Sequence, residues 1–227
     1  MKAMILAAGR GERMRPLTDH TPKPLLVAGG KPLIVWHIER LAAAGFRELV
    51  INHAHLGEKL EAALGDGRQW GVHIAWSPEP PGALETAGGI AKALPLLGNG
   101  SFLVVNGDIW CDWDFHRARN LADRPAHLVM MDNPAHHAGG DFRLDEHHSP
   151  AQLRLADGGP TLTYCGIGVF APSFFAGVPR GAAMKLRPLL DEAIPRGIVT
   201  GERHTGRWVD VGTPERLATL DRELSAK

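Results

Sequence analysis

The sequence has few of the features that mark disulfide-stabilised, membrane-spanning or nucleic-acid-binding proteins. It has only two cysteines, Cys111 and Cys165, without a CxxC spacing, which excludes a disulfide scaffold and favours a reducing compartment. The N-terminal apolar run is too short for a signal peptide or a membrane span. Basic and acidic residues balance at 25 each, so no net field attracts nucleic acid or an anionic membrane. We therefore expect a cytoplasmic protein without nucleic-acid or membrane partners, for which a monomeric state is compatible with the sequence.

The apolar runs that are present are short and alternate with helical patterns. Strands are expected at 4–7, 48–52, 72–76, 102–105, 127–132, 161–170 and 198–200, and helices at 32–45, 58–64, 186–194 and from Thr213 onward. This rhythm predicts an α/β fold with a doubly wound, mixed but mainly parallel sheet. Residues 134–160 are polar and predict loops around short hairpin strands. Because no repeat or linker interrupts the chain, we expect a single domain over 1–227.

A glycine-rich loop follows the first strand. Gly9 and Gly11 allow a backbone that turns its N–H groups toward phosphate oxygens, and Arg13, Arg15 and Lys23 supply positive charge. The loop is neither a dinucleotide-binding GxGxxG nor a Walker A motif. It indicates a phosphate site, and a tight turn flanked by solvated arginines is the alternative.

Two aspartates follow apolar strands. Asp108 ends the Asn-Gly-Asp sequence after the strand at 102–105, and Asp210 follows another short apolar run. Ligands of open α/β sheets bind beyond the carboxyl ends of the strands, and carboxylates are ligands for Mg²⁺. The two residues are therefore candidate metal ligands, although aspartate is also common in plain turns.

The segment from Pro78 to Gly89 is the candidate pocket for the base of a nucleotide. Gly88 and Gly89 remove side chains that would block a pyrimidine, and the alternative is a glycine-rich helix start capped by Thr86. The histidines that follow later do not have metal-ligand spacing and predict a polar, flexible loop. They are His136, His137, His147 and His148.

Five motifs occur in one order along the chain. They are LAAGRGERMRPLT with TPKPL, then LETAGGI at 84–90, NGD at 106–108, GDF at 140–142 and WVDVGTPERL at 208–217. Together they resemble the signature of the sugar-1-phosphate nucleotidyltransferases. The resemblance implies a Rossmann-like fold with a small β-rich sugar-binding insertion, and an enzyme that joins a nucleoside triphosphate to a sugar phosphate and releases pyrophosphate.

Within that family the chain most resembles the short bacterial uridylyltransferases that act on N-acetylmuramic acid 1-phosphate. This likeness implies UTP and a sugar 1-phosphate as substrates, Mg²⁺ as the cofactor, and a role in cell-wall recycling. Two alternatives stay open. One is another acceptor, such as mannose or glucose 1-phosphate, with GTP or dTTP as donor, and the other is a catalytically silent regulator that binds nucleotide sugars.

The resemblance also implies roles for individual residues. Arg15 and Lys23 are expected to stabilise charge on the departing pyrophosphate, and Asp108 and Asp210 to bind the metal. Asp108 also counts among the catalytic residues. The expected nucleotide-binding residues are Gly11, Glu12, Arg13, Lys23, Glu85, Thr86 and Gly88. The expected sugar-phosphate-binding residues are Asn106, Asp141 and Lys185.

Overall fold

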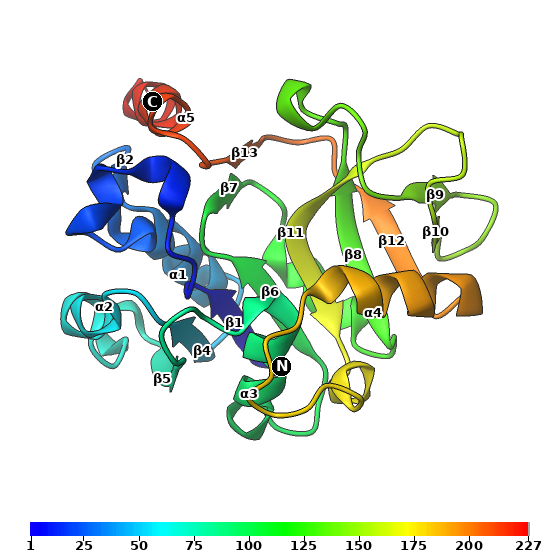
Figure 1. Ribbon diagram of the computed structural model, residues 1–227, viewed down its shortest axis with the longest axis horizontal. Helices are drawn as coiled ribbons and strands as arrows, with labels where there is room; N and C mark the ends of the chain where they lie inside the picture. The colour runs from blue at the N-terminus through cyan, green and yellow to red at the C-terminus, as the bar shows by residue number, and fades with distance from the viewer. Residues whose placement is uncertain (227) are drawn as a thin grey trace.

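The computed structural model describes residues 1–226, and a nine-stranded mixed sheet forms its centre (Figure 1). In sheet order the strands are β5 (His73–Pro78), β4 (Glu48–His53), β1 (Ala3–Leu6), β6 (Phe102–Asn106), β11 (Thr163–Phe170), β8 (Ala126–Met131), β12 (Val199–Arg203), β10 (Gln152–Arg154) and β9 (Arg143–Asp145). The first four run parallel to one another, and β12 runs parallel to β8. The remaining pairs are antiparallel, so the mixed α/β sheet expected from the sequence is confirmed.

Helices cover both faces of this sheet. On one face lie α1 (Leu33–Ala43) and α2 (Gly57–Leu64), and on the other lie α3 (Glu85–Leu97) and α4 (Leu186–Ala193). Successive residues of β1 alternate between the two cores: Ile5 packs with α1 and α2, whereas Met4 packs with α3 and α4. Burial on both faces explains why the parallel strands appear in the sequence as continuous apolar runs.

The helix ends follow the signals in the sequence closely. Helix α1 begins at Leu33, one residue after Pro32, and the chain leaves it through Gly45, whose φ is 80°. Helix α5 (Pro214–Ser225) begins after Thr213, whose hydroxyl accepts a hydrogen bond from the Arg216 N–H at 3.4 Å. Thr213 therefore caps α5 as predicted.

Two small two-stranded ribbons lie outside the nine-stranded sheet. Strands β7 (Ile109–Cys111) and β13 (Trp208–Asp210) form an antiparallel ribbon. Strand β7 was not predicted, and β13 includes the short apolar run expected before Asp210. Strands β2 (Val27–Ala28) and β3 (Lys31–Pro32) form the second ribbon, a hairpin. Within residues 134–160, β9 and β10 form a hairpin at the edge of the nine-stranded sheet. Among residues 1–226, no helix has the length and apolar content needed to cross a bilayer.

A small third core fixes the relation of the ribbon to the glycine-rich loop. Met14 from the loop, Trp110 from β7 and Val211 just after β13 are buried together. Leu220 of α5 completes the same cluster, and α5 packs beside β2 (Figure 1). This packing holds the loop against the end of the ribbon that carries Asp210.

Candidate active site

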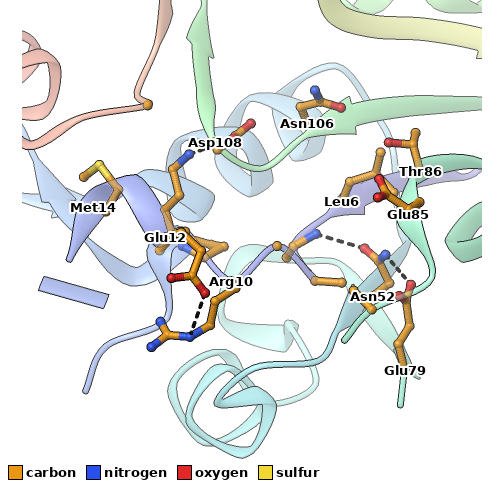
Figure 2. Close-up of a pocket in the computed structure, with 18 of the residues that line it drawn as sticks. Leu6, Arg10, Glu12, Met14, Asn52, Glu79, Glu85, Thr86, Asn106 and Asp108 are labelled. Atoms are coloured by element: carbon orange, nitrogen blue, oxygen red, sulfur yellow. Dashed lines mark hydrogen bonds and ion pairs between the residues drawn. The ribbon is translucent and has the colours of Figure 1, made fainter. Parts of the chain in front are cut away.

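A cavity of about 450 Å³ opens at the carboxyl ends of β1 and β6. Figure 2 shows Arg10 and Glu12 on one side of it, Asn106 and Asp108 on another, and Glu85 and Thr86 facing them. The glycine-rich loop supplies a continuous part of the wall, residues 9–14. The loop and the proposed base segment therefore line one cavity, although 71 residues separate Met14 from Glu85.

The glycine-rich loop is held by its own hydrogen bonds. The Thr18 hydroxyl donates to the Gly11 carbonyl at 2.9 Å, and Arg10 donates to the Thr18 carbonyl at 2.8 Å. Gly11 has a φ of 69°, and a β-carbon there would lie 3.0 Å from Thr18 Cγ2. A residue without a side chain is thus needed at Gly11 for both its backbone conformation and its close packing.

A buried polar network, which the sequence analysis missed, connects this loop to the base segment. Asn52 accepts a hydrogen bond from the Ala7 N–H at 2.9 Å and donates to Glu79 at 2.6 Å, as Figure 2 shows. The second oxygen of Glu79 accepts from the Leu84 N–H at 2.7 Å. The available signal was a polar residue near the end of each of two predicted strands. The network fixes the spacing between the loop and the start of α3.

Lys23 and Asp108 form an ion pair in the wall of the first cavity. Lys23 Nζ lies 2.7 Å from Asp108 Oδ2. The lysine side chain is only 9% exposed, whereas the aspartate side chain is 41% exposed. Lys23 is therefore fixed against a carboxylate that remains open to the cavity.

A buried histidine supports the strand that follows Asp108. Burial lowers the pKa of His37 to about 4, so its imidazole is neutral at pH 7. His37 Nε2 lies 2.8 Å from the Ile109 carbonyl oxygen, which can only accept, so this nitrogen carries the proton. His37 lies in the middle of α1, where its helical spacing gave no sign of this contact.

A second cavity, of about 340 Å³, adjoins the first. The two share the lining residues Arg13, Asn106 and Asp108. The second cavity also contains Asp210, because the Val211 N–H donates to the Asp108 carbonyl at 3.0 Å and joins the two strand ends. The convergence of both aspartates on one site, expected from the sequence, is what the structure has. Trp208 lines the same cavity, and its indole N–H donates to the Cys165 carbonyl at 2.8 Å.

The two aspartates suit a hard divalent cation. One oxygen of each is bound, Asp108 Oδ2 by Lys23 and Asp210 Oδ2 by Arg216 at 2.5 Å. Their Oδ1 atoms have no hydrogen-bond partner within residues 1–226. Two carboxylates with open oxygens on one cavity form the donor set that Mg²⁺ uses together with phosphate oxygens and water.

Glu85 and Thr86 line the first cavity, but Gly88 does not reach it. Helix α3 begins at Glu85, whose φ is 58°, and Leu84 occupies the capping position. Thr86 therefore lies within the first turn and is not the cap that the alternative interpretation assigned. Gly88 is buried, and its N–H donates to the Met184 carbonyl at 3.1 Å. Gly88 therefore supports the base segment by packing against Ala182 and Met184, without contacting the cavity.

Gly88→Ala is expected to destabilise the protein. The added β-carbon would lie 2.2 Å from the Ala182 carbonyl oxygen, so backbone must move, and we expect a loss of about 1–3 kcal/mol in the free energy of unfolding. Gly100→Ala is the matched control, because no atom lies within 4 Å of the corresponding β-carbon. Urea unfolding measures both variants, and equal stabilities would contradict the packing role of Gly88.

Besides Gly88, three expected site residues lie outside both cavities. The Arg15 side chain is 56% exposed and pairs with Asp19 at 2.7 Å, outside both cavities. This ion pair raises the pKa of Arg15 and lowers the pKa of Asp19. Lys185 precedes α4 and also lies outside both cavities. Asp141 lies beside the second cavity, with Oδ1 3.2 Å from the lining residue His137.

The histidines divide into two groups. His136 and His137 line the second cavity, and His136 Nε2 lies 3.3 Å from Asp210 Oδ2. This pair lies in a turn between β8 and β9, within the segment expected to be a polar loop, and the turn forms part of the cavity wall. His147 and His148 lie in the turn between β9 and β10, outside both cavities.

The chain is similar to known proteins over most of its length. Residues 2–138 match the family model described as nucleotidyl transferase. The chain is 55% identical to the N-acetylmuramate alpha-1-phosphate uridylyltransferase of Neisseria meningitidis serogroup B, covering 96% of this chain and 95% of that protein. Its identity to the enzyme of the same name from Caulobacter vibrioides is 34%, over 98% and 96%. It is 32% identical to the mannose-1-phosphate guanylyltransferase of Mycobacterium tuberculosis, over 94% of this chain but 61% of that protein.

Solved structures share the fold. HddC from Yersinia pseudotuberculosis, complexed with GMP-PN, superposes with a TM-score of 0.78 at 18% identity and covers 98% of both chains. A Bacillus anthracis protein in complex with sucrose gives 0.84 at 20% identity, covering 100% of this chain and 96% of that chain. With the family match over most of the motifs and a relative above 50% identity along nearly the whole chain, the protein belongs to the nucleotidyl transferase family.

Proposed function

We propose that this enzyme transfers the uridylyl group of UTP to N-acetyl-α-muramic acid 1-phosphate, giving UDP-N-acetylmuramic acid and pyrophosphate. A phosphate oxygen of the sugar attacks the α-phosphorus, the bond to the β-phosphate oxygen breaks, and pyrophosphate leaves with the electron pair. The observation that carries the proposal is the pair of adjoining cavities that share Arg13, Asn106 and Asp108. A reaction between two bound anions needs two such sites with charged groups at their junction.

The first cavity is assigned to UTP. Its glycine-rich loop and Lys23 are suited to the triphosphate, and Glu85 and Thr86 to the region of the base. The Asn52–Glu79 network sets the distance between these two parts. The second cavity is assigned to the sugar phosphate, with Asn106 at the boundary.

Members of this family use a divalent metal, and we assign Mg²⁺ to Asp108 and Asp210. When bound there, the ion would neutralise charge on the phosphates of both substrates. Lys23 and Arg13 contribute fixed positive charge at the same junction, and the cavity walls hold the reacting groups in place. This continuous arrangement supports the view that residues 1–227 act as one nucleotidyltransferase domain.

Arg13, in place of Arg15, is assigned to the charge on pyrophosphate. A β-carbon at Gly212 would lie 3.1 Å from both Arg13 Nη2 and Asp210 Oδ2, so the guanidinium approaches the metal aspartate. Arg13→Gln is expected to reduce kcat/KM about 10²-fold or more, since one donor to developing charge is lost. Arg15→Gln should change it by less than about threefold, because the Arg15 side chain is 56% exposed and lies outside both cavities. Steady-state kinetics decide, and a larger loss for Arg15→Gln would reverse the assignment.

The donor base is tested with a panel of triphosphates. With N-acetylmuramic acid 1-phosphate as acceptor, we expect pyrophosphate release with UTP to exceed that with GTP, dTTP and CTP by at least about tenfold. A preference for GTP would favour the second candidate, a guanylyltransferase like the mannose-1-phosphate enzyme of Mycobacterium tuberculosis. Binding of UTP without release of pyrophosphate for any acceptor would instead indicate a catalytically silent regulator.

A further inference from the structure

His136 and His137 reach the second cavity from a turn that the proposed reaction has not yet used. The turn, Ala135–His137, follows β8 and lies near β13, where Figure 1 shows the green chain approaching the orange chain. His136 Nε2 lies 2.9 Å from Arg216 Nη1 and 3.3 Å from Asp210 Oδ2. His137 has a different set of contacts.

Side-chain hydrogen bonds fix the conformation of the turn that carries these histidines. The Asn133 side chain donates to the Ala138 carbonyl at 3.1 Å and accepts from the Thr163 hydroxyl at 2.9 Å. The Thr161 hydroxyl donates to the Gly139 carbonyl at 2.8 Å. A β-carbon at Gly140 would lie 2.5 Å from Asn133 Oδ1, so the turn closes tightly on itself. The side chains on this turn therefore have a defined place at the cavity wall.

Asp141 orients the imidazole of His137. Its Oδ1 lies 3.2 Å from His137 Nε2, and its Oδ2 accepts the Tyr164 N–H at 2.8 Å. Arg187 adds a positive charge 3.9 Å from Oδ1. Both carboxylate oxygens are thus occupied by protein groups, which makes Asp141 a positioning residue more than a direct ligand of the sugar. His137 Nδ1 has no hydrogen-bond partner within residues 1–226.

The proposed acceptor carries a carboxylate that could serve as the missing hydrogen-bond partner of His137 Nδ1. N-acetylmuramic acid differs from N-acetylglucosamine by a lactyl ether, which ends in a carboxylate. Among the residues that line the second cavity, the side chains able to carry a positive charge toward a carboxylate are those of Arg13, His136 and His137. Arg13 is placed at the junction with the nucleotide and His136 is held by Asp210 and Arg216. A carboxylate accepts hydrogen bonds, so His137 would donate to it through Nδ1 and to Asp141 through Nε2.

We infer that His137, oriented by Asp141, binds the lactyl carboxylate and is the residue that selects N-acetylmuramic acid 1-phosphate over N-acetylglucosamine 1-phosphate. The inference rests on the proposed function, since it concerns the acceptor of that reaction. It assigns a chemical role to a histidine that has no assigned contact with the phosphates or the metal. Arg187 balances the charge of Asp141, so the carboxylate of Asp141 does not repel the acceptor.

The test compares kcat/KM for the two acceptors, with UTP and Mg²⁺, in the unaltered enzyme and in His137→Phe. We expect the substitution to reduce kcat/KM for N-acetylmuramic acid 1-phosphate by about 10–100-fold, the effect of losing a hydrogen bond to a charged group. The value for N-acetylglucosamine 1-phosphate should change by less than about threefold, since this acceptor has no group for His137 to bind. His147→Phe, an exposed histidine of the β9–β10 turn, is the matched control and should behave as the unaltered enzyme.

Binding of the two products provides a second measurement that does not depend on turnover. In isothermal titration calorimetry, His137→Phe should bind UDP-N-acetylmuramic acid more weakly than the unaltered enzyme does. Its affinity for UDP-N-acetylglucosamine should be unchanged. An equal loss for both acceptors, or no loss for either, would overturn the inference while the proposed function stands. If the unaltered enzyme releases pyrophosphate equally well with both acceptors, the inference falls together with the proposed acceptor. No release with any acceptor would overturn the proposed function itself.

Discussion

Asp108→Asn is expected to reduce turnover by at least about 10³-fold, because a metal ligand and the partner of Lys23 change together. The substitution keeps the size of the side chain and one oxygen that accepts from Lys23 Nζ. It removes the negative charge from a residue shared by both cavities. The 41% exposed side chain contributes little to the core, so the free energy of unfolding should change by less than about 1 kcal/mol.

Asp112→Asn is the matched control, because it removes the same charge from a nearby position outside the site. Asp112 directly follows β7, at the end opposite Asp108, and lies outside both cavities. The turnover of Asp112→Asn should stay within about threefold of that of the unaltered enzyme, as for a surface substitution. Near-normal turnover of Asp108→Asn in the same assay would remove Asp108 from the metal site.

Lys23→Met is expected to lower kcat by about 10²–10³-fold, the loss seen when a preorganised donor to transition-state charge is removed. Methionine fills the buried volume of the lysine stem but has no charge, and Asp108 remains hydrated at the cavity surface. The fold should therefore persist, as circular dichroism and a thermal melt can establish. Because the ammonium is held 2.7 Å from Asp108, its loss affects the junction of both substrates.

Lys59→Met gives the corresponding control. Lys59 is exposed on α2 and donates to the His20 carbonyl, away from the cavities. Equal losses for the two lysine variants would mean that charge anywhere on this surface matters, which contradicts a specific role for Lys23. A variant of Lys23 that retains full kcat would contradict the role as well.

The sequence predicts most of this fold because its strands are buried on both faces. The apolar run of β6 and the Thr213 cap of α5 are local signals, and both appear where expected. Strands β7 and β13 have three residues each and pair across about a hundred residues. No local pattern specifies such a ribbon, although it is what brings Asp108 and Asp210 together.

The site shows the same division between local and long-range information. Cation-rich spacing identifies the loop that carries Arg13 and Arg15, but the backbone decides that Arg13 faces the cavity and Arg15 faces Asp19. In the sequence the pair His136 and His137 was indistinguishable from a solvated loop. Its place beside Asp210 depends on the path that residues 132–140 take after β8.

The most direct test of the account is pyrophosphate release by the purified protein with Mg²⁺, UTP and N-acetylmuramic acid 1-phosphate, together with the mass of the nucleotide product. The account predicts one pyrophosphate for each UDP-N-acetylmuramic acid formed, at a rate above that with the 1-phosphates of N-acetylglucosamine, glucose and mannose. Absence of product with this acceptor, while another sugar 1-phosphate or another triphosphate is turned over, would contradict the assignment of the two cavities to these substrates.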